Sequence, residues 1–173
     1  MGYYDNLKQI NIFPNMKPIE IVQIDNSKEL DAARQLFIEY QQWLNTDLCF
    51  QGFEQELASL PGKYAEPHGS ILLAKHQNEI IGCVAVRQLK DDICEMKRLY
   101  VKPESQGLSA GRMLAEAIVR KAKILGYQKM QLDTLQRLDR AIGLYEKLGF
   151  KEIRPYYDNP LDEVVYWELD LTS

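Results

Sequence analysis

Hydrophobic and polar positions alternate over short runs of this chain, and apolar side chains recur at helical spacing between them. Residues 19–24 form one such run, and apolar side chains follow at intervals of three and four over residues 30–40. Alternate residues of a strand face opposite sides, whereas a helix gathers every third and fourth residue on one face. The pattern predicts a strand over residues 19–24, a helix that Ser27 caps, and a short helix over residues 53–60.

Three consecutive strands are predicted next, over residues 70–76, 80–88 and 93–101, because short polar turns separate these apolar runs. A helical face from Leu108 to Leu125 follows and ends at Gly126. A strand over residues 130–133, a helix over residues 138–148 and strands over residues 150–153 and 164–169 complete the chain. This order predicts a mixed, mostly antiparallel α/β sheet that is flanked by helices and contains one crossover unit.

Length and composition are those of one globular domain. The chain has 173 residues, of which 46% are hydrophobic and 27% charged, enough to bury a core. We expect residues 1–17 to form an N-terminal extension, aromatic through Tyr3, Tyr4 and Phe13, and residues 18–173 to form the folded domain. A net charge of −4 argues against a nucleic-acid partner bound through overall basicity.

Several other classes of site and location are disfavoured. The three cysteines form no CxxC pair, and their odd number cannot close into a complete disulfide framework, which favours a reducing compartment. His68 and His76 lack metal-ligand spacing, so no metal is expected. The longest apolar run, residues 80–86, is far shorter than the roughly 18 residues of a membrane helix. With no secretory signal pattern at the N-terminus, we expect a cytoplasmic protein without membrane association.

A glycine-bearing turn joins a strand to a helix in the segment MKRLYVKPESQGLSAGRML, from Met96 to Leu114. Unpaired backbone N–H groups and the positive end of the helix dipole meet at such a junction and suit a bound phosphate. The turn alone is weak evidence, because glycine precedes helices for ordinary capping reasons. A Rossmann site is disfavoured because the turn follows the fourth predicted strand, and a Walker loop is excluded because no Gly-Lys-Ser/Thr follows.

Two more motifs accompany this turn: ICEMKRL, from Ile93 to Leu99, and AIGLYEKLGF, from Ala141 to Phe150. The combination of VxPxxxGxxxGxxL with AxxLYxKxGF at this separation resembles the GNAT superfamily of N-acetyltransferases. The resemblance covers the order of elements over residues 19–171 and the specific motifs over residues 95–150.

The resemblance implies the GNAT fold, in which the fourth and fifth strands splay apart into a slot for acetyl-CoA. The pantetheine arm would bond to backbone groups of the fourth strand, where an N–H near Leu99 or Tyr100 would hold the developing oxyanion. The pyrophosphate would lie on the turn and helix start. Ser109 stands where the family pattern has glycine, and Leu138 where many members have an asparagine that contacts the cofactor. The implied cofactor-binding residues are Leu99, Tyr100, Val101, Gln106, Gly107, Leu108, Ser109, Ala110, Gly111 and Arg112.

Tyr145 and Glu95 match catalytic positions of the family. The tyrosine hydroxyl would protonate the departing CoA thiolate, although helical spacing alone would make Tyr145 a core residue. Glu95 would take a proton from the amine, often through water, because an amine with a pKa near ~10.4 is protonated at neutral pH. The alternative is that Glu95 merely pairs with Lys97 or Arg98.

The implied reaction is direct transfer of an acetyl group from acetyl-CoA to a primary amine. We favour a small molecule over a protein as the acceptor, and small polyamines, amino acids, antibiotics and protein N-termini all remain open. Two alternatives remain open: a CoA-binding regulatory module without turnover, and transfer of a longer acyl group. A homodimer that pairs the final strands of two chains is also open. Candidates to line an acceptor pocket are Trp43, Tyr64, Tyr156, Tyr157 and Glu163.

Overall fold

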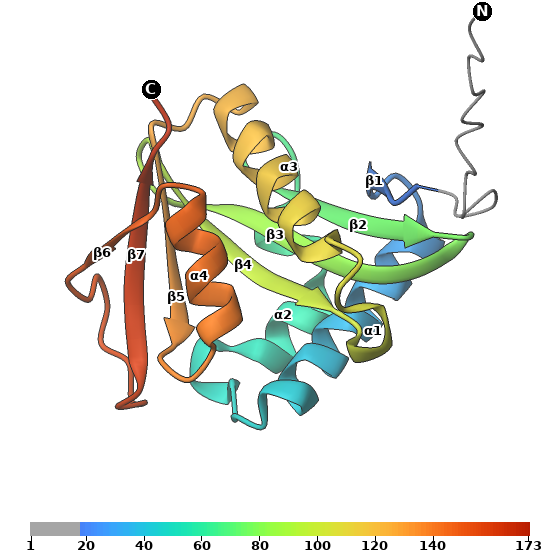
Figure 1. Ribbon diagram of the computed structural model, residues 1–173, viewed down its shortest axis with the longest axis horizontal. Helices are drawn as coiled ribbons and strands as arrows, with labels where there is room; N and C mark the ends of the chain where they lie inside the picture. Colours follow the sequence, from blue (N-terminus) through green and yellow to red (C-terminus); the bar gives the residue numbers. More distant parts are fainter. Residues whose placement is uncertain (1–17) are drawn as a thin grey trace, which may run out of the picture.

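The computed structural model describes residues 18–173, so the expected extension with Tyr3, Tyr4 and Phe13 lies outside the described residues. One seven-stranded sheet runs in the order β1-β2-β3-β4-β5-β7-β6, with helices on both faces (Figure 1). The strands are β1 (Glu20–Gln23), β2 (Ser70–His76), β3 (Glu79–Lys90), β4 (Ile93–Val101), β5 (Lys129–Leu135), β6 (Lys151–Ile153) and β7 (Val164–Asp170). The helices are α1 (Ser27–Leu44), α2 (Phe53–Ser59), α3 (Ala110–Ile124) and α4 (Asp139–Lys147), with short 3₁₀ turns η1 (Cys49–Gln51), η2 (Gly62–Tyr64) and η3 (Pro103–Ser105).

The predicted fold class is confirmed, and each predicted strand and helix forms within a few residues of its expected bounds. All neighbouring strands pair antiparallel except β4 and β5, which are parallel and joined through α3. The cap predicted for α1 is wrong by one residue. Asn26 caps the helix, because its side-chain oxygen accepts a hydrogen bond of 2.9 Å from the Glu29 N–H, and Ser27 is already helical.

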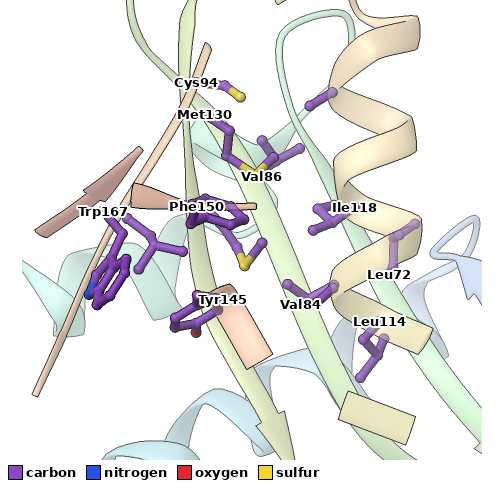
Figure 2. Packing of buried hydrophobic residues seen from close by; sticks show 14 of the residues in the cluster. Leu72, Val84, Val86, Cys94, Leu114, Ile118, Met130, Tyr145, Phe150 and Trp167 are labelled. Carbon is purple, nitrogen blue, oxygen red and sulfur yellow. The ribbon is translucent and has the colours of Figure 1, made fainter. Parts of the chain in front are cut away.

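Two hydrophobic cores lie on opposite faces of the sheet. One packs α3 and α4 against the sheet, and Figure 2 shows Leu114 and Ile118 of α3 near strand residues, with Tyr145 and Phe150 beside Trp167. The other packs α1 and α2 against the opposite face. Strand alternation explains this division: Val84 of β3 lies in the α3 core, whereas its neighbours Cys83 and Ala85 lie in the α1 core. No described helix is long and apolar enough to cross a membrane.

Strands β4 and β5 pair only at their first three residues, Ile93–Glu95 with Lys129–Gln131. Beyond these pairs β4 remains bound to β3 and β5 to β7, so the two strands separate as they run. A bulge in β4 accompanies the separation, because two residues, Arg98 and Leu99, stand opposite one residue of β3. Arg98 has a positive φ of 58°, unusual for a residue other than glycine. The expected splay between the fourth and fifth strands is therefore present.

Candidate active site

A groove runs from the end of β4 over the turn and start of α3 to α4. Its volume is about 370 Å³, and we call it the glycine groove. Leu108 and Arg112, two of the ten cofactor-binding residues expected from the sequence, do not line it. The other eight do: Leu99, Tyr100, Val101, Gln106, Gly107, Ser109, Ala110 and Gly111.

The turn in the glycine groove is open where a ligand would approach its backbone. Gly107 has a φ of +92°, and a Cβ placed there would meet no described atom within 4 Å. A Cβ at Gly111 would meet only Val101, at an ordinary 3.7 Å, so internal packing does not require this glycine. Helix α3 begins without a side-chain cap, so its first N–H groups lack a side-chain acceptor, and its first residues, Ala110 and Gly111, line the groove. These features fit a pyrophosphate.

The arginine that lines the glycine groove is not the one that the sequence predicted. Arg112 is exposed, and its Nε donates to Glu116 Oε1 one turn along α3 at 2.7 Å. Arg140, in the first turn of α4, instead lines the glycine groove together with Ala141 and Leu144. The sequence carries no signal for Arg140, because the crossover that brings α4 beside α3 is a tertiary feature.

Tyr145 lies in the opening between the splayed strands, which we call the strand slot. Met96 and Leu99 of β4 line this slot with Leu132 of β5. Tyr145 is 6% exposed, and its ring packs against Phe150 at a centroid distance of 5.6 Å (Figure 2). No described group hydrogen-bonds its hydroxyl. Burial is the main cause that raises the pKa of the Tyr145 phenol, and the neighbouring Tyr40 and Asp133 raise it further. The phenol is therefore protonated at neutral pH.

Glu95 is fully buried on the α1 side of β4 and is held from two directions. Arg87 donates to its Oε1 through Nε at 3.0 Å and also approaches it through Nη2 at 2.8 Å. The Tyr156 hydroxyl donates to Oε2 at 2.6 Å. Lys97 lies 3.8 Å from Oε1, whereas Arg98 pairs with Glu56 at 2.9 Å. The main charge partner of Glu95 is thus Arg87 of β3, which sequence spacing along β4 could not indicate.

A second buried group of polar side chains crosses from β4 to β5. Lys97 Nζ lies 3.2 Å from Asp133 Oδ1, and the Tyr157 hydroxyl donates to Oδ2 at 2.8 Å. Burial alone would raise the pKa of Asp133, but the Lys97 charge and the Tyr157 hydrogen bond outweigh it and lower the pKa. Asp133 is a residue that sequence reasoning missed, since an acidic residue on a short strand carries no recognisable pattern.

A third opening, which we call the charged cavity, has a volume of about 600 Å³ beside Glu95. Ionisable side chains make up most of its lining. The strand slot shares Trp43, Leu99 and Ala141 with the glycine groove, and it shares Gln51, Lys97 and Arg98 with the charged cavity. The three openings therefore adjoin in series, with the strand slot in the middle.

The five candidate acceptor-lining residues are not all brought together. Tyr156 and Tyr157 line the charged cavity, and Trp43 lines the strand slot. Tyr64 is buried in the core, where its hydroxyl donates to Glu56, and Glu163 lines none of the three openings. Leu138 does line the strand slot. Within residues 18–173 no group of three or more His, Cys, Asp or Glu side chains is arranged to hold a metal.

Comparison with known proteins agrees with this geometry. A model of the acetyltransferase (GNAT) family matches residues 30–150. An uncharacterised N-acetyltransferase of Schizosaccharomyces pombe is 44% identical over 162 residues, covering 91% of this chain and 99% of the relative.

Solved structures share the fold at lower identity. A GNAT-family acetyltransferase from Staphylococcus aureus Mu50 has a TM-score of 0.73 at 20% identity, covering 89% of this chain and 99% of that one. A Salmonella typhimurium protein solved with its cofactor acetyl-CoA has a TM-score of 0.68 at 15% identity, covering 90% and 95% of the two chains. With the splayed strands, the glycine turn and the match over residues 30–150, the chain belongs to the GNAT family and is an N-acetyltransferase.

Proposed function

We propose that this N-acetyltransferase transfers an acetyl group from acetyl-CoA directly to a primary amine of a small molecule. One arrangement supports this function above all: the strand slot, lined by Tyr145, opens to the glycine groove on one side and to the cavity beside Glu95 on the other. A cofactor and an acceptor could thus enter from opposite sides and meet between β4 and β5.

The glycine groove provides the groups that a pyrophosphate and a pantetheine arm require. The N–H groups at the start of α3 suit the phosphates, and Arg140 lies close enough to the same groove to add a positive charge. Past Glu95, β4 has no strand partner on its β5 side, so backbone groups near Leu99 and Val101 can bond to an extended ligand there. Bound acetyl-CoA would supply the acetyl thioester.

Tyr145 and Glu95 would move the protons of the transfer. As the bond between the amine nitrogen and the acetyl carbon forms, Glu95 would accept the proton that the nitrogen releases, directly or through water. As the carbon–sulfur bond breaks, Tyr145 would donate its phenolic proton to the sulfur. A phenol with an ordinary pKa near ~10 is already protonated at neutral pH, so Tyr145 carries the proton that this step requires. The free cysteines Cys49, Cys83 and Cys94 support a reducing location such as the cytoplasm.

Calorimetry with acetyl-CoA, followed by thiol release across a panel of amines, tests the proposed function. We expect saturable binding and thiol release that depends on an added amine, with one acetylated amine formed for each thiol. Thiol release without an acetylated product, or binding without any turnover, would contradict the proposal. Propionyl-CoA and longer acyl-CoA donors in the same assay would reveal a preference for a longer acyl group.

A further inference from the structure

We propose that the acceptor is an amino carboxylate, a small molecule with a carboxylate beside its primary amine, and that the charged cavity binds this carboxylate. The inference rests on the proposed function and deepens it by naming the substrate class. It depends on how charges are distributed and paired around the charged cavity, next to Glu95.

The acidic side chains in and beside the charged cavity are largely neutralised by the protein itself. Glu95 is bound by Arg87, and Asp133, just beyond the cavity, is bound by Lys97. Glu56 is bound by Arg98, whose side chain is only 4% exposed. These paired carboxylates offer little attraction to an additional cation, because each negative charge already has a cation at hydrogen-bonding distance.

Positive groups remain available in the same cavity. Lys63, from η2, and Lys90, from the end of β3, both line it and have no ion-pair partner among residues 18–173. Arg87 also keeps free donors: Nε and Nη2 face Glu95, and no described group accepts from Nη1. Against these cations stands Asp158, an exposed carboxylate without a described partner. The cavity is therefore positive inside a chain whose net charge is −4.

This charge distribution favours an acceptor that carries a carboxylate, on two grounds. A carboxylate would gain hydrogen bonds from Arg87 and attraction from two lysines, whereas a polyamine would meet like charges. Nearby positive charges also lower the pKa of an amine, and so raise the fraction of the uncharged form that can attack. The volume of about 600 Å³ lies in the range of small-molecule sites, roughly 300–1,000 Å³.

The test is an acceptor screen with the full-length wild-type enzyme and acetyl-CoA. The screen contains the twenty L-amino acids, the carboxamide of each amino acid that reacts, and the polyamine spermidine. We expect at least one amino acid to react with a kcat/KM about tenfold or more above its carboxamide and above spermidine. We also expect its KM to rise with ionic strength, because partly exposed charges are screened.

Two lysine variants locate the carboxylate site. Lys63→Gln and Lys90→Gln should each raise the KM of the reactive amino acid about two- to fivefold, the effect of one exposed charge, and should lower kcat by less than they raise KM. The affinity for acetyl-CoA should stay constant in both. Lys151→Gln is the matched control, because Lys151 is an exposed lysine on the edge strand β6 and lines none of the openings.

The outcomes separate this inference from the function on which it rests. Faster acetylation of spermidine or of carboxamides than of amino acids would overturn the inference and leave the acetyltransferase function intact. An unchanged KM in both lysine variants would overturn the assigned carboxylate site. If acetyl-CoA binds measurably but no amine in the panel supports thiol release, the result would instead count against the proposed function itself.

Discussion

Tyr145 has the burial of a core residue, and its proposed catalytic role rests on its position in the strand slot. It packs against Phe150 and is 6% exposed, yet its hydroxyl has no described hydrogen-bond partner and the side chain lines the strand slot. Among the described residues, the fully buried side-chain polar atoms without a partner are Ser70 Oγ, His76 Nδ1 and Trp167 Nε1, and the Tyr145 hydroxyl is not one of them. Its oxygen therefore keeps some exposure, and the strand slot gives a bound ligand access to it.

Tyr145→Phe should lower kcat by about 10²-fold or more, in the range of a lost general acid, with the affinity for acetyl-CoA nearly unchanged. Steady-state kinetics and calorimetry measure the two quantities. Tyr127→Phe is the control, since it removes a buried hydroxyl that donates to the His68 carbonyl, away from the strand slot. Equal turnover in Tyr145→Phe and the wild type would refute the proton-donor role.

Glu95→Gln should lower kcat/KM at neutral pH, and the loss should shrink as the pH approaches 9.5. The physical reason is that an amine with an ordinary pKa near ~10.4 supplies more of its free base at high pH and needs the carboxylate less. Glu29→Gln serves as control, because it removes a half-buried carboxylate that pairs with Lys75 and lines none of the three openings. A loss in Glu95→Gln that is constant from pH 7 to 9.5 would leave Glu95 with a structural role only.

At the scale of elements, the junction between β4 and α3 depends on unusual backbone conformations. Arg98 introduces the bulge in β4 with a φ of 58°, and Ser109 precedes α3 with a φ of 64°. Side chains beyond glycine rarely adopt this region, because Cβ approaches the following carbonyl oxygen. Arg98 lines the strand slot and Ser109 lines the glycine groove, so the strained backbone lies at the two openings themselves.

Ser109→Gly should raise the unfolding free energy by about 0.5–1 kcal/mol, the relief of left-handed strain minus the extra freedom of glycine in the unfolded chain. Chemical denaturation measures this change. Ser109→Ala keeps the strain and removes the hydroxyl, so it should not stabilise. If the hydroxyl contributes to phosphate binding, both variants weaken acetyl-CoA binding alike, whereas tighter binding in Ser109→Gly alone would assign the effect to closer backbone approach.

At the scale of the whole molecule, one sheet separates two cores and carries the site where its strands part. The α3 core holds Tyr145, and the α1 core borders Glu95 through α2 and η1. The proposed acid and base are thus supported from opposite faces and meet only through the opening between β4 and β5. Both cores must therefore stay packed to hold Tyr145 and Glu95 in their relative positions.

The unfolding free energy should fall as the pH rises above 10. Burial is the largest cause that raises the pKa of both Tyr64 and Tyr145 above the ordinary 10.0. Above pH 10 the unfolded chain therefore releases these protons while the folded chain keeps them, so stability decreases by up to about 1.4 kcal/mol per pH unit for each tyrosine.

Urea denaturation at pH 9, 10 and 11 measures this alkaline loss. Tyr64→Phe should show a shallower decline than the wild type, because one of the buried phenols with a raised pKa is absent. The same slope in the variant and the wild type would show that other groups cause the alkaline loss.

The sequence alone determined the order and kind of the elements, the family and the glycine turn. These are local or nearly local properties: alternation distinguishes strands from helices, and the two motifs around Gly107 and Tyr145 keep a fixed spacing. The sequence could not show that Glu95 pairs with Arg87 or that Arg140, and not Arg112, lines the glycine groove. It also could not show that Lys97 and Tyr157 contact Asp133. Those contacts join residues on different elements, so only the packing of strands and helices decides them. The proposed acceptor rests on the positive charge that this packing leaves unpaired.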